Sequence, residues 1–259
     1  MSKKVSSNSL QEADVDIFSL IRNNDYEGTV KFLAGATVDQ VNQVEERTGN
    51  TPLHAACLEC KTLDEKILIA LLEVSKAQLS PNTNLQFEGI KVDVQNTNLN
   101  TPLHYFCAKW QSPDLKPLHL MLKQGVKVDA VNENGETAIF NTIFNNAIRN
   151  LLLETLFENG ANVNQLNSNG EGVLHYAVRF GRADLVNLIL TSSPSLDIRG
   201  KEGKTPYELA VQYKYKNIAR HLKKVEELFE WLDSHDISET KGLFLKNEIF
   251  KNLLSDITD

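Results

Sequence analysis

One four-residue string constrains the fold of this chain more than any other feature. Thr-Pro-Leu-His occurs at residues 51–54 and again at 101–104, and altered copies begin at Thr137, Val173 and Thr205. Successive copies start 50, 36, 36 and 32 residues apart. Recurrence at this spacing predicts a solenoid, in which small structural units stack in a row and each unit contacts only its neighbours.

The residue types in the string suit the start of a helix. Threonine is a good N-cap, and proline is best tolerated as the first helical residue. An apolar helical stretch follows each copy, and the second stretch of two units stops at Gly125 and Gly160, where glycine fits the left-handed cap position. Short extended pieces at 128–131, 163–166 and 196–199 then lead through polar turns into the next copy. Each unit is therefore expected to be a helix, a second helix and a projecting hairpin.

These units resemble ankyrin repeats, whose period is about 33 residues. The resemblance is strong in the copies at Thr51 and Thr101 and weaker in the copy at Thr137. It implies an all-α fold class, an ankyrin-repeat solenoid with a helix-turn-helix and a β-hairpin in each repeat, followed by a C-terminal helical segment. The expected segments are a disordered N-terminus at 1–11, an ankyrin domain at 12–224 made of a capping repeat at 12–47 and repeats at about 48–98, 99–134, 135–169, 170–202 and 203–224, and a helical module at 225–259.

Two regions depart from the regular repeat. The long first interval is explained by an insertion at about 73–88, between the second helix and the hairpin of the first clear repeat. This insertion is either a tolerated surface loop or a contact for a specific partner. Upstream, residues 14–24 and 26–33 look like a helix pair without the Thr-Pro-Leu-His start. We expect a capping pair, which solenoids need to cover their apolar ends.

Composition and charge exclude several classes of protein. Hydrophobic residues make up 41% of the 259 residues, yet no apolar run approaches the length of a membrane span, and the first residues lack the apolar stretch of a signal peptide. We therefore expect a cytoplasmic protein, or a nuclear one. The net charge of −7 argues against a nucleic-acid partner.

Residues that could suggest chemistry have structural explanations. Cys57 and Cys60 have Cys-x-x-Cys spacing, but no second pair completes a zinc site, and we expect Cys57 and Cys107 to be buried between helices. His54, His104 and His175 all stand at the histidine position of the motif, so we expect a repeated structural role. No phosphate-binding loop or catalytic motif is present. We predict no enzymatic activity, no cofactor and no metal.

Binding then remains, and the resemblance implies where it would occur. In ankyrin repeats the inner-helix positions four, seven and eight after the threonine, together with the hairpin tips, line a concave groove. Four rings are candidates for an aromatic stripe there, either as exposed contact residues or as packing between repeats. The predicted partner-binding residues are Tyr105, Lys109, Phe144, Asn145, Tyr176, Phe180, Gln212 and Tyr213, of which Tyr105, Phe144, Phe180 and Tyr213 form the stripe.

The C-terminal stretch has a different pattern. Apolar residues at helical spacing over 217–232 predict that the second helix of the last repeat continues into the next segment. From about residue 225 the spacing resembles the first part of a sterile alpha motif domain, although Thr240 stands where that family usually has an aromatic residue. A complete domain would need about 30 further residues. If the helices only cap the solenoid, Trp231 and Phe244 should be buried against the last repeat; if they form a module, these rings should pack on each other and on Leu253.

Two functions are compatible with this reading. The first is a non-catalytic scaffold that binds a partner protein through the groove and self-associates, or binds a second partner, through the sterile-alpha-like segment. The second is the regulatory N-terminal region of a larger signalling enzyme, such as a protein kinase or a small-GTPase regulator. The identity of the partner is not encoded in the repeats, because their groove residues vary to suit unrelated ligands.

Overall fold

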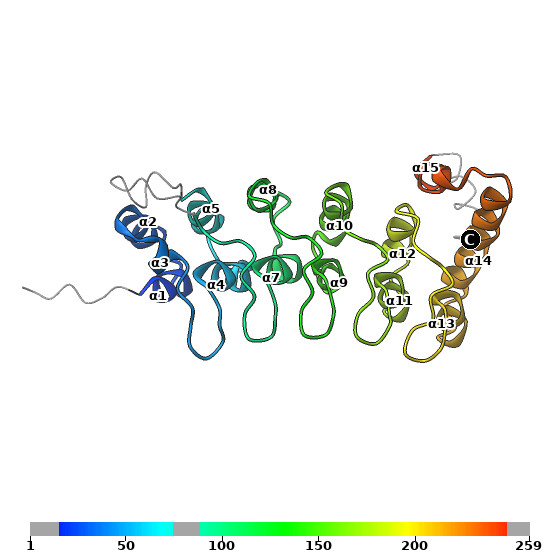
Figure 1. Cartoon of the computed structure of the whole chain (residues 1–259), viewed down its shortest axis with the longest axis horizontal. Helices are drawn as coiled ribbons and strands as arrows, with labels where there is room; N and C mark the ends of the chain where they lie inside the picture. Colours follow the sequence, from blue (N-terminus) through cyan, green and yellow to red (C-terminus); the bar gives the residue numbers. More distant parts are fainter. Residues whose placement is uncertain (1–15, 75–88, 248–259) are drawn as a thin grey trace, which may run out of the picture.

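The computed structural model describes residues 16–74 and 89–247, and in these ranges the helices stand in two stacked rows with loops projecting beyond one row (Figure 1). Those two ranges contain no β-strand, which confirms the all-α ankyrin-repeat solenoid. The β-hairpin predicted for each repeat is wrong in this respect, because the described projecting segments are loops closed by turns and contain no paired strands. The inner row, nearer the loops, comprises α1 (Ile17–Arg22), α4 (Pro52–Glu59), α7 (Pro102–Lys109), α9 (Ala138–Thr142), α11 (Val173–Arg179) and α13 (Pro206–Gln212). The outer row comprises α2 (Tyr26–Gly35), α5 (Glu65–Glu73), α8 (Lys116–Lys123), α10 (Arg149–Glu158), α12 (Ala183–Leu190) and α14 (Lys216–Ser234).

The repeated string begins each inner helix for the expected reason. Thr51, Thr101, Thr137 and Thr205 are the N-caps of α4, α7, α9 and α13. In the fourth repeat the N-cap is Gly172, not Val173, so the predicted start of this copy is wrong by one residue. Glycine tolerates the extended N-cap conformation but has no side chain to cap the helix, and for this reason the position is difficult to recognise in the sequence.

The motif histidines join each repeat to the next, as expected. In His54 the unprotonated Nδ1 accepts the backbone N–H of Thr51 at 3.1 Å, and Nε2 lies 2.9 Å from the carbonyl oxygen of Asn100 in the following hairpin. His104 and His175 repeat this arrangement towards the following hairpins. Because all three rings are buried, each one both caps its own helix and fixes the spacing of two repeats.

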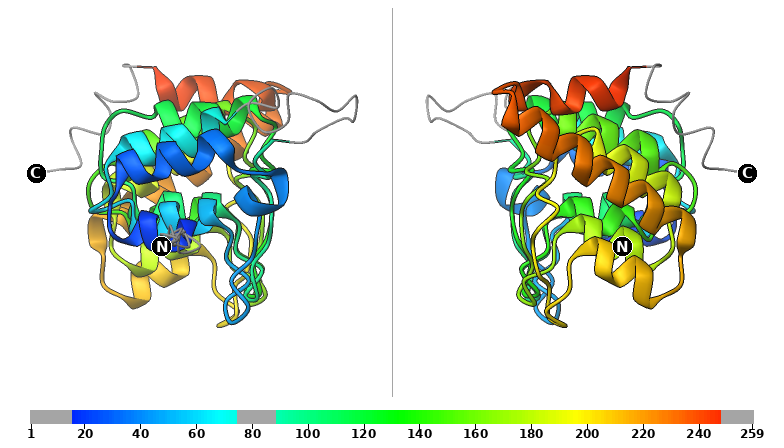
Figure 2. Two further views of the ribbon diagram at one scale, coloured as in Figure 1. Left: turned by 90° about the vertical axis from the view of Figure 1, so that its left-hand side faces the viewer. Right: turned by 90° about the vertical axis from the view of Figure 1, so that its right-hand side faces the viewer.

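The hairpin loops form closed turns that contact one another. Asn96 is typical: its Oδ1 accepts the backbone N–H groups of residues 98 and 100, both at 3.0 Å, and Asn132 and Asn167 do the same in their own loops. Single backbone hydrogen bonds tie neighbouring tips, such as Glu133 N–H to the Asn98 carbonyl at 3.0 Å. Viewed along the solenoid, the loops extend on one side past the inner helices and give the molecule an L-shaped section (Figure 2).

The turns of the hairpins require a left-handed backbone at one position. Gly49, Gly135, Gly170 and Gly203 occupy it with φ between 67° and 72°. The second hairpin has Leu99 there, at φ 57°, and this side chain is 46% exposed. A branched, bulky residue is strained in this region of φ and ψ, and the exposure of Leu99 recovers little burial energy in return.

Beyond the last repeat the chain turns back over the solenoid. α14 is one continuous helix through the expected boundary at residue 225, which confirms the predicted continuation. A 3₁₀ turn (Ser238–Thr240) and α15 (Lys241–Lys246) follow, and α15 lies above α12 (Figure 1). Gly242 approaches the Thr191 carbonyl so closely that a Cβ there would stand 2.7 Å from the carbonyl oxygen.

Neither expectation for the C-terminal rings is met. Trp231 is 50% exposed and stacks on His235 at 4.3 Å between ring centroids, and Phe244 is also exposed. The apolar residues buried here are instead Val225, Phe229, Leu232 and Leu245. Leu253 lies outside the described residues, as do the N-terminal segment 1–15 and most of the predicted insertion at 73–88.

Candidate partner-binding groove

Because the fourth repeat begins at Gly172 and not at Val173, its residues align differently with the groove positions of the other repeats. Counting from Gly172, Tyr176 is at position four, where Tyr105 and Asn141 stand in their own repeats. Phe144 is at position seven of the third repeat, and Phe180 is at position eight of the fourth. The predicted stripe, which also includes Tyr105 at position four, therefore combines three different helix positions.

The two tyrosines at position four contact the hairpins. The hydroxyl of Tyr105 accepts a hydrogen bond from Asn96 Nδ2 at 2.9 Å, and Tyr176 accepts one from Asn167 Nδ2 at 3.2 Å. Tyr176 also donates to Glu136 Oε1 at 2.6 Å. Burial and this carboxylate raise the pKa of Tyr176 to about 12. Both rings are half-buried, so they combine inter-repeat packing with a groove-facing edge.

Phe144 and Phe180 meet across the junction between the third and fourth repeats. Their ring centroids are 5.4 Å apart at an interplanar angle of 80°, which is a favourable edge-to-face arrangement. Phe144 is 52% exposed and Phe180 is 48% exposed. Tyr176 lies 6.3 Å from Phe180 and 5.2 Å from Phe140, so four rings gather here and the outer two remain open to a ligand.

Asn145 is placed differently from the prediction. It is buried, and its Nδ2 donates to the carbonyl oxygens of Cys107 at 3.1 Å and Trp110 at 2.6 Å. Its Oδ1 accepts the backbone N–H groups of Ala147 and Ile148. The two Nδ2 bonds join the end of α7 to the segment between α9 and α10, and the two Oδ1 bonds close the turn within that segment. This side chain therefore holds two repeats together and is not available to a partner.

The remaining predicted residues lie on α7 and on the last repeat. Lys109 is exposed at the C-terminal end of α7. Gln212 is exposed but interacts with Lys204 and Glu202 on the last hairpin. Tyr213 is half-buried and lies 6.0 Å from Tyr215, whose ring packs over Gly181. The structure therefore brings Phe144, Tyr176 and Phe180 together, while Tyr105 and Tyr213 stand apart.

Two further residues, Leu99 and Asn141, are candidates for this surface, although they were not among the predicted partner-binding residues. Leu99 stands at a hairpin tip where four other repeats have glycine, a difference that the aligned copies already contain. Asn141 is half-buried at position four, and its Oδ1 has no hydrogen-bond partner among the described residues. Nothing in the sequence distinguishes this asparagine from a satisfied one.

Ion pairs between acidic and basic side chains lie between the fourth repeat and the following hairpin. Glu171 is buried and pairs with Arg179, which also lies 3.8 Å from Glu202. Burial raises the pKa of Glu171, and the nearby Arg179 opposes that shift. A Cβ at Gly200 would come within 2.7 Å of the Glu171 side chain, so glycine is needed there for the carboxylate to fit.

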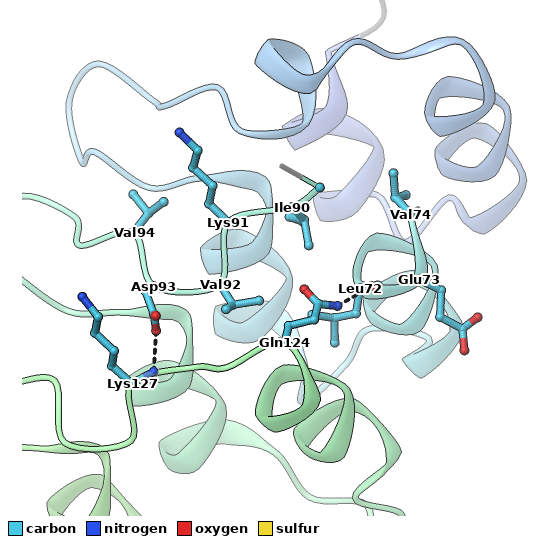
Figure 3. Close-up of a pocket in the computed structure, with 11 residues that line it drawn as sticks. Leu72, Glu73, Val74, Ile90, Lys91, Val92, Asp93, Val94, Gln124 and Lys127 are labelled. Carbon is cyan, nitrogen blue, oxygen red and sulfur yellow. Dashed lines mark hydrogen bonds between the residues drawn. The ribbon is translucent and has the colours of Figure 1, made fainter. Parts of the chain in front are cut away.

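A cavity lies elsewhere, between the end of α5 and the segment at 89–94 (Figure 3). Its volume is about 960 Å³. Within it, Gln124 Nε2 donates to the Leu72 carbonyl at 2.7 Å, and the Lys127 N–H donates to Asp93 Oδ1 at 2.8 Å. These bonds connect adjacent repeats, and the lining offers no nucleophile paired with a base.

The described parts of the chain offer no other recognisable site. Between residues 16 and 74 and between 89 and 247, no group of three histidine, cysteine or acidic side chains could hold a metal ion. Over the same ranges no helix is long and apolar enough to cross a bilayer. Cys57, Cys60 and Cys107 are buried free thiols, as expected for the first and third. Burial raises the pKa of Cys60 to about 12, so this thiol is not activated as a nucleophile.

Comparison with known proteins agrees with the geometry. Residues 143–227 match the family described as ankyrin repeats (3 copies), so the chain contains an ankyrin-repeat solenoid. It is 41% identical over 216 residues to a probable serine/threonine-protein kinase of Dictyostelium discoideum, covering 83% of this chain and 24% of the kinase. It is also 41% identical over 177 residues to stress-activated protein kinase alpha of the same organism, covering 68% of this chain and 28% of that protein.

A third relative is much shorter. Ankyrin repeat domain-containing protein 37 of Bos taurus is 27% identical over 115 residues, which cover 44% of this chain and 72% of that protein. The chain thus spans 24% and 28% of the lengths of the two kinases it resembles, and matches the short ankyrin protein over most of that protein's length.

Proposed function

We propose that this region is a non-catalytic protein-interaction unit that binds a partner protein through the concave groove and the hairpin tips. The observation that carries the proposal is the contact between Phe144 and Phe180, two large rings that are each about half exposed at the junction of two repeats. Single exposed apolar residues are common on protein surfaces, but paired aromatic rings on a rigid concave face are typical of binding hot spots.

The surrounding structure supports this use of the rings. Burying one aromatic side chain removes about 150–250 Å² from water, and the two χ angles of each ring lose little entropy on binding. Lys109 and Tyr213 stand further along the same face, and Tyr105 provides a half-buried ring that the hairpin already orients. A partner would therefore meet a preorganised surface and would not have to order it.

The test compares partner binding with stability in matched variants. Partner proteins are first captured with the chain and identified, and their affinity is then measured by calorimetry for wild type, Phe144→Ala and Tyr105→Ala. We expect Phe144→Ala to weaken binding by about tenfold or more with an unchanged melting temperature. Trp231→Ala removes an equally exposed ring far from the groove and should change affinity less than about twofold. Equal affinity of wild type and Phe144→Ala would contradict the proposal.

A second candidate is favoured by the relatives. Two proteins named as kinases are each 41% identical to this chain over most of its length, although the chain spans 28% or less of theirs. We infer that the repeats can serve as the regulatory region of a larger protein kinase. Sequencing the transcript beyond the codon for Asp259 tests this directly: a kinase domain in frame supports it, and a stop codon soon after Asp259 refutes it.

A further inference from the structure

α14 forms the C-terminal end of the solenoid, and the described residues leave one of its faces exposed. This helix stands at the right-hand end of Figure 1 and runs across the front of the right-hand view in Figure 2. One side of the helix is buried, through Ile218, Leu222 and Val225 among others. Six exposed residues follow one another at intervals of three or four on the other side, which places them on one helix face: Asn217, Arg220, Lys224, Glu227, Trp231 and Ser234. These six residues are the outer face of α14.

The two halves of the outer face differ in chemistry. The first half carries the cations Arg220 and Lys224, and the second carries the carboxylate of Glu227 and the indole ring of Trp231. Within residues 16–74 and 89–247, neither these two cations nor Glu227 forms an ion pair. Trp231 is 50% exposed, although His235 stacks on its ring. The outer face therefore presents charges of both signs, unpaired in the described chain, beside an exposed aromatic ring.

The order of these groups is complementary to itself. Arg220 and Trp231 are equally distant from the point midway between Lys224 and Glu227. A second copy of α14, laid antiparallel about that point, places each Lys224 opposite Glu227 of the other copy and each Arg220 opposite its Trp231. A parallel arrangement would instead place each cation opposite the same cation, which is destabilising. The charge pattern therefore favours one occupant in one orientation, a second copy of this chain.

We infer that two copies of this chain associate through the outer face of α14, as an antiparallel helix pair with two-fold symmetry. Such a contact uses the same surface on both copies, so every favourable pair occurs twice. Helix axes packed about 8–10 Å apart bring facing side chains into contact. The Arg220 guanidinium then lies over the Trp231 ring of the other copy, which is a favourable cation–π arrangement, and Lys224 and Glu227 pair as ions.

The contact is small, which sets its expected strength. α14 has 19 residues and is about 28 Å long, so one helix pair falls at the low end of the areas found in specific interfaces. We therefore expect a reversible dimer with a dissociation constant in the micromolar range. The outer face belongs to a different helix row from Phe144 and Phe180, so this association is independent of the groove. It also does not depend on a sterile alpha motif domain.

Sedimentation velocity of the 259-residue chain from about 5 to about 200 µM measures this equilibrium. Wild type should shift from monomer to dimer as the concentration rises. Trp231→Ala, Lys224→Glu and Glu227→Lys should each weaken association by about tenfold or more, since each change removes or reverses two symmetric contacts. Lys123→Glu makes the same charge change on the exposed end of α8, and its association should stay within about twofold of wild type.

Mixing two variants separates pairing from an effect on the fold. In a dimer of the Lys224→Glu variant carboxylates face each other, and in a dimer of the Glu227→Lys variant ammonium groups face each other. In a mixed dimer of the two variants both contacts join opposite charges again. An equimolar mixture should therefore associate about as strongly as wild type, although neither variant does so alone. Both variants should melt at the wild-type temperature, because both positions are exposed.

Three results would overturn the inference. Wild type that remains monomeric at about 200 µM would leave residues 248–259 or a different protein as the occupant of this face. A dimer that is insensitive to Lys224→Glu would show that the copies meet through another surface. A mixture of the two charge variants that stays monomeric would exclude antiparallel pairing, because this arrangement requires that the mixture associates.

Discussion

The stability of the repeats should fall steeply between about pH 7.5 and about pH 5, because their buried histidines must stay neutral. Burial lowers the pKa of His54 and of His221 to about 4, against an ordinary value near 6.5. The unfolded chain therefore binds more protons than the folded chain in this pH range, so the free energy of unfolding decreases as the pH falls. Burial also lowers the pKa of His104 and of His175, so these residues act in the same direction.

The magnitude follows from the two pKa values. At about pH 5, one histidine with a folded pKa of about 4 and an unfolded pKa near 6.5 costs about 2 kcal/mol relative to neutral pH. His54 and His221 together account for about 4 kcal/mol, a large part of the 5–15 kcal/mol that is typical of a folded domain. Glu171, whose pKa is raised mainly by burial, opposes this trend and reduces it.

Urea unfolding followed by circular dichroism at both pH values measures the effect. His221→Leu isolates one contribution, because in the part of the chain that the structure describes Nδ1 of this buried ring has no hydrogen-bond partner, and leucine fits an apolar helix face. At about pH 7.5 the variant should be as stable as wild type or more so, and its loss of stability at about pH 5 should be smaller by about 2 kcal/mol.

His119, which is exposed on α8, provides the matched control. His119→Leu should show the same pH dependence as wild type. The reasoning is refuted if wild type is equally stable at the two pH values, or if His221→Leu loses as much stability on acidification as wild type does.

Two further predictions concern Leu99 and Asn145, whose roles differ from those expected from their positions in the repeat. Leu99→Gly should raise the free energy of unfolding, measured in urea, by about 1 kcal/mol, since it relieves the strain of a leucine in a left-handed backbone conformation. The reverse change, Gly135→Leu, should lower the free energy of unfolding by more than that. No gain for Leu99→Gly would show that the hairpin has adapted to leucine. Asn145→Ala should lower the free energy of unfolding by about 3 kcal/mol, because it leaves several backbone groups between α7 and α10 unpaired. The exposed Asn150→Ala is its control, and equal stability of these two variants would contradict the bridging role.

Local chemistry explains why so much of the solenoid could be predicted. The start of each inner helix depends on a threonine that caps and a proline that fits the first turn, and the end of α8 depends on Gly125 at φ 79°. These requirements act over four or five residues and so leave a direct record in the chain. The structural role of the motif histidines could be predicted for the same reason, because their position repeats.

The prediction failed where the signal was weak or the interaction was long-range. Gly172 was missed as an N-cap because glycine lacks the capping oxygen that identifies threonine. Asn145 was expected in the groove from its helix position, but it is buried because α9 ends at Thr142 and the chain turns inward towards α7. The exposure of Trp231 could not be anticipated either, since Leu232, the next residue on the same helix, is fully buried while the ring is half exposed.

The sequence by itself determined the architecture of this protein: a periodic series of helix pairs, its inner helix starts and its joining histidines. Tertiary structure alone decided which groove residues are usable. Phe144 and Phe180 come from different helix positions and meet only because the two repeats stack with a fixed offset. The buried Oδ1 of Asn141 has no hydrogen-bond partner within residues 16–74 and 89–247, which its helix position alone does not reveal. The physical reason is that helix signals are local, whereas exposure and hydrogen-bond satisfaction depend on atoms contributed by residues far apart in the chain.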